Sequence, residues 1–282
     1  MKNQIKIASF LFLFVFTAFA AAYGQQQPKQ LLKSTTFKNE TVEFGAGGTV
    51  TIVGAPLGSI SVEGWQQNRI EVQAEIELQA ETEEDLKLLA GVTGFIFDDG
   101  FGHTQILSVG THDRSYMKKT AKKFPKRLLG LPFRIDYKIK VPYYTDLEIN
   151  GGKGDFTLAN VEGAMFIKFL ESNAKLNLSG GAVDATFGGG NVEIVFAKPS
   201  WRGRMMNVAL ASGTMNVIFP ASMNADLDAS ILRNGRIENN FKAMKPRDRT
   251  KFTEKTIVAR AGNGGAALNF KVGDGTLIIA EK

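Results

Sequence analysis

A nine-residue repeat between residues 147 and 194 constrains the fold of this chain more than any other feature of its sequence. Each unit opens on glycine or serine and then places apolar residues at two alternate positions, with a residue between them that is polar in most units. The units start at Gly154, Gly163, Ser172, Gly181 and Gly190. Alternation of this kind after a tight turn is typical of a short β-strand, so the repeat predicts one strand per unit.

A single nine-residue unit cannot fold alone. Burying its two apolar side chains contributes roughly 3–6 kcal/mol, whereas ordering its backbone costs on the order of 9–18 kcal/mol. Stacked units share one buried stripe and their backbone hydrogen bonds, which is how a solenoid becomes stable. The repeat therefore predicts an all-β fold, a right-handed parallel β-helix (β-solenoid) or flattened β-roll, with two or three short glycine-punctuated strands per coil.

The pattern also appears before the main repeat, at a ten-residue step, in units that start at Gly48, Gly58 and Asn68. We therefore expect stacked strands in the amino-terminal half as well. Beyond them, Thr82 followed three residues later by Asp85 is a capping signal that predicts one short helix over about 83–89. We expect this helix to lie as a lid on the solenoid.

The first 24 residues are typical of a targeting segment. Lys2 and Lys6 precede an apolar run, and Ala22-Tyr23-Gly24 fits a small-x-small cleavage site. We expect a signal peptide over 1–24, with an uncleaved anchor as the alternative, and therefore export to the periplasm, the cell surface or the medium. After signal removal we expect no transmembrane span, because no later apolar stretch approaches the ~20 residues that one needs.

The remaining chain divides into two further parts on the same evidence. Residues 25–43 are polar, and we expect a flexible lead-in there. Residues 44–282 carry the strand pattern and predict one β-solenoid domain. Within it, residues 81–134 break the pattern, and we interpret them as an insertion that contains the helix and a basic loop.

This basic loop is the candidate binding segment. Between residues 114 and 127 there are seven basic residues and no acidic one, and Met117 and Phe124 are spaced as on a short amphipathic helix that ends at Pro125. Such a segment attracts phosphate-rich or anionic glycan surfaces; the alternative is a solvated charged loop. The candidate anionic-surface residues are Arg114, Lys118, Lys119, Lys122, Lys123, Lys126 and Arg127.

The sequence does not support several kinds of metal-binding, redox or catalytic chemistry. The chain has no cysteine, which excludes disulfides, thiolate metal sites and cysteine nucleophiles. Its two histidines, His103 and His112, have too few neighbouring ligands for zinc, and the single aspartate of Gly151-Gly-Lys-Gly-Asp155 is too little for calcium. We therefore expect no metal and no cofactor. We do not expect nucleic acid as a partner either, because export separates the protein from intracellular nucleic acid and the sequence has no signature of a nucleic-acid-binding fold.

A glycan-active β-helix enzyme, a polysaccharide lyase or hydrolase, is the enzymatic alternative and would need paired carboxylates on one exposed sheet. The outward position of the repeat places Lys175 beside Glu193 if a coil has two strands, or beside Glu148 if it has three. Either pairing is charge compensation rather than an acidic pair, so we predict no catalytic residue. Four aromatic residues are candidates for a sugar-stacking platform or for caps of the solenoid core: Trp65, Tyr143, Tyr144 and Trp201.

Three features of the chain resemble the bacterial putative-adhesin family, a group of unknown function. They are the stretch Gly58–Trp65, the strand Tyr137–Pro142 with the following Leu147-Glu-Ile149, and the glycine-led units through Gly275–Ile279. The resemblance covers roughly residues 44–282 and implies a parallel β-helix fold and an exported cell-envelope protein. We therefore predict a non-enzymatic adhesin or envelope binding or scaffold protein that recognises a glycan, an anionic surface or another envelope protein. The alternatives are the glycan-active enzyme and an envelope sensory or regulatory domain.

Overall fold

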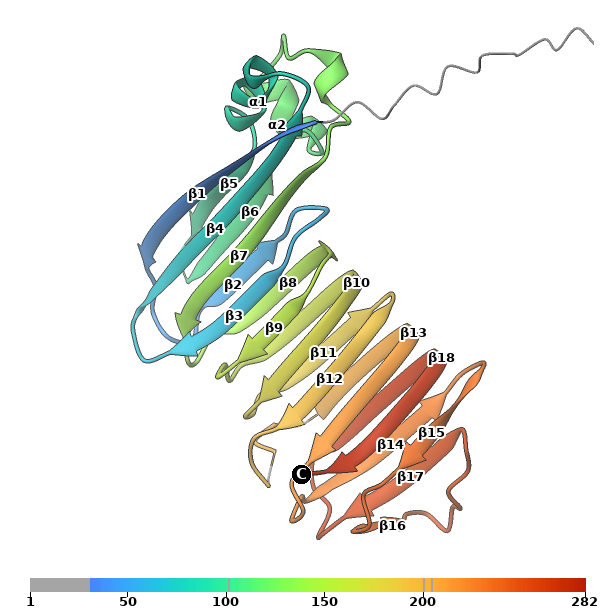
Figure 1. Ribbon diagram of the computed structural model, residues 1–282. Helices are drawn as coiled ribbons and strands as arrows, with labels where there is room; N and C mark the ends of the chain where they lie inside the picture. Colours follow the sequence, from blue (N-terminus) through green and yellow to red (C-terminus); the bar gives the residue numbers. More distant parts are fainter. Residues whose placement is uncertain (1–30, 101, 200, 204) are drawn as a thin grey trace, which may run out of the picture. The chain divides into compact units, whose positions relative to one another are not determined.

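The computed structural model describes residues 31–100, 102–199, 201–203 and 205–282, and the predicted signal peptide lies outside them. Strands make up most of this part of the chain (Figure 1), which confirms the all-β class. Where one helix was predicted, the structure has two α-helices, α1 (Glu83–Ala90) and α2 (Arg114–Thr120), and a 3-10 helix, η1 (Lys126–Leu128). No helix in the described residues has the length and apolar composition needed to cross a membrane.

Parallel strands form two ladders, and each ladder contains strands from alternate units of the repeat. The first contains β2 (Thr49–Val53), β8 (Asp146–Lys153), the first half of β10 (Ala164–Leu178), β11 (Ala182–Phe187) and the first half of β13 (Met205–Phe219). The second contains β3 (Ile60–Trp65), β9 (Phe156–Ala159), the second half of β10, β12 (Gly190–Phe196) and the second half of β13. Because β10 and β13 belong to both ladders, the pairings among β10, β11, β13 and β12 close a ring of parallel strands.

The register of these ladders shows that successive repeat units alternate between them. Lys175 pairs with Glu193, eighteen positions (193 minus 175) along the chain, and its Nζ lies 2.8 Å from Glu193 Oε1. A nine-residue unit is therefore half of an eighteen-residue coil with two strands, the first of the two arrangements considered above. The right-handed winding of a β-helix stays a prediction.

Both ends of the ladders depart from a simple solenoid. The last strand, β18 (Ala267–Glu281), pairs with β13 on one side and with β14 (Ala225–Ile231) and β15 (Gly235–Asn239) on the other, so it lies between strands that precede it in the sequence. β17 (Thr256–Ala261) is antiparallel to β14 and carries the short β16 (Met244–Pro246).

At the amino-terminal end, β6 (His103–Val109) and β7 (Phe133–Pro142) extend the two ladders in parallel beyond β2 and β3. β5 (Gly94–Gly100) is antiparallel to β6, and β4 (Arg69–Ala80) is antiparallel to β7. The strand β6 thus belongs to a ladder although it lies inside the predicted insertion.

The expected flexible lead-in is wrong for residues 32–43, which form the strand β1 (Leu32–Glu43). All 12 of its residues pair with β4 in antiparallel register. None of its side chains is fully buried. Backbone hydrogen bonds to a neighbouring strand, rather than apolar burial, hold this polar segment, which is why the hydrophobic pattern could not reveal it.

The core lies between the two ladders and is filled by alternate residues of each strand. Phe156, Phe169 and Phe187 stack along it, with ring centroids 4.7 Å and 6.1 Å apart. The predicted helix is confirmed as α1: Thr82 Oγ1 accepts a hydrogen bond from Asp85 N at 3.1 Å, and Leu86 and Leu89 are buried. These contacts place α1 against the core cluster.

Candidate functional site

The predicted basic segment is a folded element of the structure. Asp113 Oδ1 caps α2 by accepting hydrogen bonds from Ser115 N at 2.8 Å and Tyr116 N at 2.9 Å. Met117 and, on η1, Leu128 are buried, and Phe124 packs against the core. The segment therefore has a fixed apolar side that joins the body of the protein.

The charged side of this segment faces solvent. Six of the seven candidate residues are exposed and form no ion pair with any residue that the structure describes. These six are Arg114, Lys118, Lys119, Lys122, Lys123 and Lys126. Because no carboxylate of the described residues forms an ion pair with them, they present a concentrated positive charge.

Arg127 differs from the other six. Its Nη1 and Nη2 donate to the two carboxylate oxygens of Asp85, each at 2.8 Å, and Asp85 is 5% exposed. The hydrogen bonds from Arg127 hold the pKa of the Asp85 carboxyl below its usual value and raise the pKa of Arg127. Arg127 therefore ties η1 to α1, and its charge is already compensated within the protein.

A second candidate site is a pocket of about 530 Å³ at the corners that follow β3, β7, β9 and β12. Backbone hydrogen bonds stack these corners: Tyr143 N donates to Trp65 O and Glu162 N donates to Tyr143 O, both at 2.8 Å. Further along the same side, Gly181 N donates to Arg202 O at 3.0 Å. The lining residues are Ala46, Trp65, Gln66, Gln67, Asn68, Pro142, Tyr143, Tyr144, Glu162, Lys198 and Arg202.

Three of the four aromatic platform candidates line this pocket. Tyr144 is 56% exposed, and its ring meets the ring of Tyr143 edge-on at 4.9 Å. Trp65 is half-buried and donates from Nε1 to Arg69 O at 2.9 Å. Trp201 is buried and packs against Phe196 at 5.5 Å, which makes it the one candidate that caps the core.

The pocket has a single carboxylate among its lining residues. Glu162 Oε2 lies 3.0 Å from the hydroxyl of Tyr143, which is also 3.2 Å from Ser179 Oγ. A hydrolase mechanism with two carboxylates cannot be assembled from this lining. The arrangement offers aromatic surface, amides and charges for binding.

The structure separates the two histidines: His103 is the first residue of β6, and His112 follows the other end of that strand. His103 Nε2 is 2.9 Å from Thr51 Oγ1, and Thr51 donates to Glu148 at 3.1 Å. His112 lies outside the strand and packs against the ring of Phe133 at 5.3 Å. Across the described ranges, no group of three or more His, Cys, Asp or Glu side chains converges in a way that could hold a metal ion.

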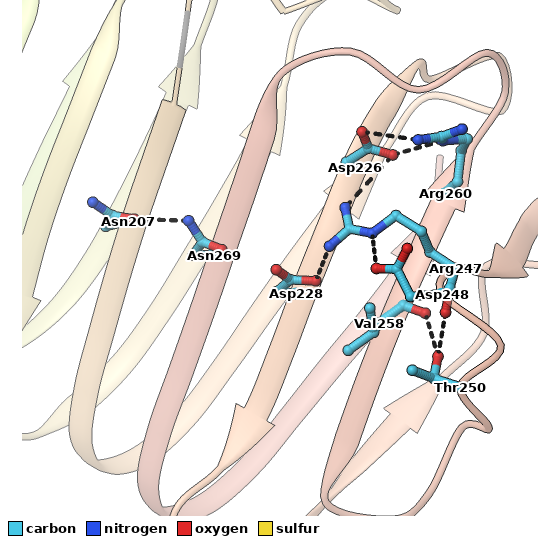
Figure 2. A network of polar contacts seen from close by, with 9 residues as sticks. All are labelled: Asn207, Asp226, Asp228, Arg247, Asp248, Thr250, Val258, Arg260 and Asn269. Carbon is cyan, nitrogen blue, oxygen red and sulfur yellow. Dashed lines mark hydrogen bonds and ion pairs between the residues drawn. The ribbon is translucent and has the colours of Figure 1, made fainter.

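The charged stretch at residues 242–255, which follows β15, takes part in a network of hydrogen bonds and ion pairs (Figure 2). Arg247 donates from Nη2 to Asp228 at 2.8 Å and from Nε to Asp248 at 3.0 Å, and Arg260 donates from Nε to Asp226 at 2.8 Å. These pairs fix the segment after β16 onto β14. The positive charges of Arg247 and Arg260 are therefore neutralised by aspartates of the protein, unlike the charges of the exposed cations on α2.

The sequence did not single out the polar residues of the pocket. Gln66, Gln67 and Asn68 form a turn, whereas Lys198 and Arg202 lie where the nine-residue register breaks. The spacing of the residues along the repeat could have indicated that they share one side of the fold. In eighteen-residue coils, Tyr143 and Glu162 fall at successive corners of the same side, because they lie nineteen positions apart (162 minus 143).

Comparison with known proteins gives few similarities. No family model matches the chain, and no curated protein matches it. The chain is similar to the structure of a putative cell adhesion protein from Clostridium sporogenes ATCC 15579, with 14% identity, 88% of this chain and 100% of that chain covered, and a TM-score of 0.47. Putative adhesins from Bacteroides fragilis NCTC 9343 and Parabacteroides merdae ATCC 43184 are each 10% identical with a TM-score of 0.26, over 86% of this chain and 97% and 95% of theirs.

Proposed function

We propose that the chain is an exported, non-enzymatic binding protein of the cell envelope that attaches to anionic surfaces through α2 and η1. The observation that carries this proposal is a set of six exposed cations on a folded and anchored segment, none of which forms an ion pair within the described part of the chain. The proposal includes cleavage of the signal peptide over 1–24 and a right-handed β-helix domain over 44–282.

Anchoring distinguishes this segment from a solvated charged loop. Met117, Leu128 and the Asp85–Arg127 pair hold its backbone in place. The cations can therefore contact a surface without the entropic cost of ordering the chain on binding. Each Lys or Arg close to an anionic membrane contributes about 1 kcal/mol, and salt screens this attraction within a Debye length of about 8 Å at physiological ionic strength. Six such residues give useful affinity from charge alone.

Vesicle binding at low and moderate salt tests the proposal. We expect the purified chain to sediment with vesicles that contain phosphatidylglycerol, more weakly at higher salt, and not with phosphatidylcholine vesicles. Changing Lys118, Lys119, Lys122 and Lys123 to Gln should remove this binding. The matched control changes four other exposed lysines to Gln and keeps the same net charge: Lys168, Lys242, Lys251 and Lys271.

Equal loss in both quadruple variants would show that net charge, and not this segment, determines the binding. If the unaltered chain does not bind the phosphatidylglycerol vesicles at low salt, the proposal is wrong.

A further inference from the structure

The pocket at the stacked corners has the size and the exposed aromatic surface of a ligand site. Its volume of about 530 Å³ lies within the ~300–1,000 Å³ common for small-molecule sites. Tyr144 exposes over half of its surface, while its contact with Tyr143 restricts the ring. Tyr143 is in turn positioned by its hydroxyl contact with Glu162. A restrained, exposed ring provides a flat apolar surface at a low entropic cost.

Side-chain amides lie next to this aromatic surface. Gln66, Gln67 and Asn68 are consecutive, exposed and line the pocket. Each amide offers two donors and a carbonyl acceptor, which matches ligands rich in hydroxyl groups, since a hydroxyl both donates and accepts. Aromatic surface together with several amides is the combination that suits a sugar ring, which has an apolar face and a polar rim.

The charges of the pocket narrow the ligand class. Lys198 and Arg202 are exposed and form no ion pair with the described residues, whereas the one lining carboxylate, Glu162, is occupied by Tyr143. Two further cations lie over the ring of Trp65, which lines the pocket: the Arg69 guanidinium is 5.1 Å and the Lys140 Nζ is 5.2 Å from the ring centroid. The excess of positive charge favours a negatively charged ligand, and Arg202 can hold a carboxylate by two parallel hydrogen bonds.

We propose that this pocket binds a glycan whose sugars carry carboxylate groups, as uronic acids do. Tyr144 and Trp65 contact the sugar ring, the amides of residues 66–68 bind its hydroxyl groups, and Lys198 and Arg202 pair with its carboxylates. Stacked parallel strands repeat at about 4.8 Å, so the corners from Glu162 to Arg202 extend over about 10 Å, which exceeds one sugar ring and favours an oligosaccharide. The site is independent of the cations on α2.

Calorimetric titration of the purified chain with tri-galacturonate tests the proposal, with the methyl ester of the same trisaccharide as the neutral ligand and poly-glutamate as the non-sugar anion. We expect tri-galacturonate to bind at least about tenfold more tightly than either. Tyr144→Ala should weaken this binding about tenfold or more. The double variant Lys198→Gln/Arg202→Gln should abolish the preference for the acid over the ester.

Controls separate this site from the basic segment. Phe166→Ala removes an exposed ring on β10, and Lys168→Gln removes an exposed cation on the same strand; both should bind as the unaltered chain does. The quadruple Gln variant of Lys118, Lys119, Lys122 and Lys123 should also retain tri-galacturonate binding. The proposal fails if the unaltered chain does not bind the trisaccharide, if the ester or poly-glutamate binds equally well, or if binding is lost only in the quadruple Gln variant of the basic segment.

Discussion

Replacing Gly190 by alanine should destabilise the protein strongly, because the backbone of the neighbouring coil leaves no room for a side chain at this position. Gly190 opens a repeat unit and lies in the second ladder between Ser172 and Gly213. Its φ of 112° is a conformation that side chains rarely adopt, and an added Cβ would lie 2.1 Å from the carbonyl oxygen of Ser172. The corners of adjacent coils are therefore too close for any side chain here.

The magnitude follows from two costs. Holding a residue with a side chain in this region of φ costs about 1–3 kcal/mol, and forcing a methyl group against a neighbouring backbone costs about 1–3 kcal/mol. The sum, about 2–6 kcal/mol, is a large part of the 5–15 kcal/mol by which a typical domain is stable. For a domain of this size, each kcal/mol lowers Tm by about 2–4 °C, so the smallest expected decrease is about 4–8 °C.

Urea unfolding followed by circular dichroism measures the effect, and Ser172→Ala is the matched control. Ser172 occupies the same corner position one coil earlier, already carries a Cβ, and has a buried Oγ without a hydrogen-bond partner among the described residues. Removing that hydroxyl should leave stability unchanged or raise it slightly. A Gly190→Ala protein within about 0.5 kcal/mol of the unaltered chain would refute the argument from crowded corners.

Two further predictions concern titratable groups. Burial raises the pKa of Tyr137, whose hydroxyl lies 2.7 Å from Ser108 Oγ, so its contribution to stability is complete below pH ~10 and declines above it, where only the unfolded chain ionises. Tyr137→Phe should cost about 1–3 kcal/mol at pH 7 in urea unfolding and should reduce this alkaline decline. The hydrogen bond from Arg260 lowers the pKa of Asp226, so the stability it contributes is present above the unfolded value of 3.8 and is lost as the pH falls through the folded value. The difference in unfolding free energy between the unaltered chain and Arg260→Gln should therefore narrow between pH ~5 and ~2; a constant difference would contradict this assignment.

The strands of the repeat were predictable because their signal is local. Alternation fixes which side chains enter the core, and the residues at those positions, such as Val183 and Val192, are buried as the pattern requires. The contact between Lys175 and Glu193 then selects two strands per coil over three. The cap of α1 was predictable for the same reason, since Thr82 and Asp85 are three residues apart.

The order of the strands was not predictable from the repeat. Any glycine-led unit fits beside any other, so nothing in Gly275–Ile279 indicates that β18 lies between β13 and β14 rather than beyond them. Long-range pairing decides this order, and a repeated local pattern carries no information about it. β1 was missed for a related reason, because its pairing with β4 uses backbone groups that every residue has.

The two proposed binding surfaces both lie on segments outside the register of the ladders. On the ladders, several exposed polar groups satisfy one another across the 18-residue register: Lys175 pairs with Glu193, and Asn191 donates to Asn173 at 3.1 Å. Such compensation stabilises the sheet but leaves little charge for a partner. Lys118 and Arg202, in contrast, lie on segments that leave the register and have no such neighbour among the described residues. Where the repeat is interrupted, side chains are released from the cross-strand pairing that the 18-residue register imposes, and this is why we place both binding surfaces at its interruptions.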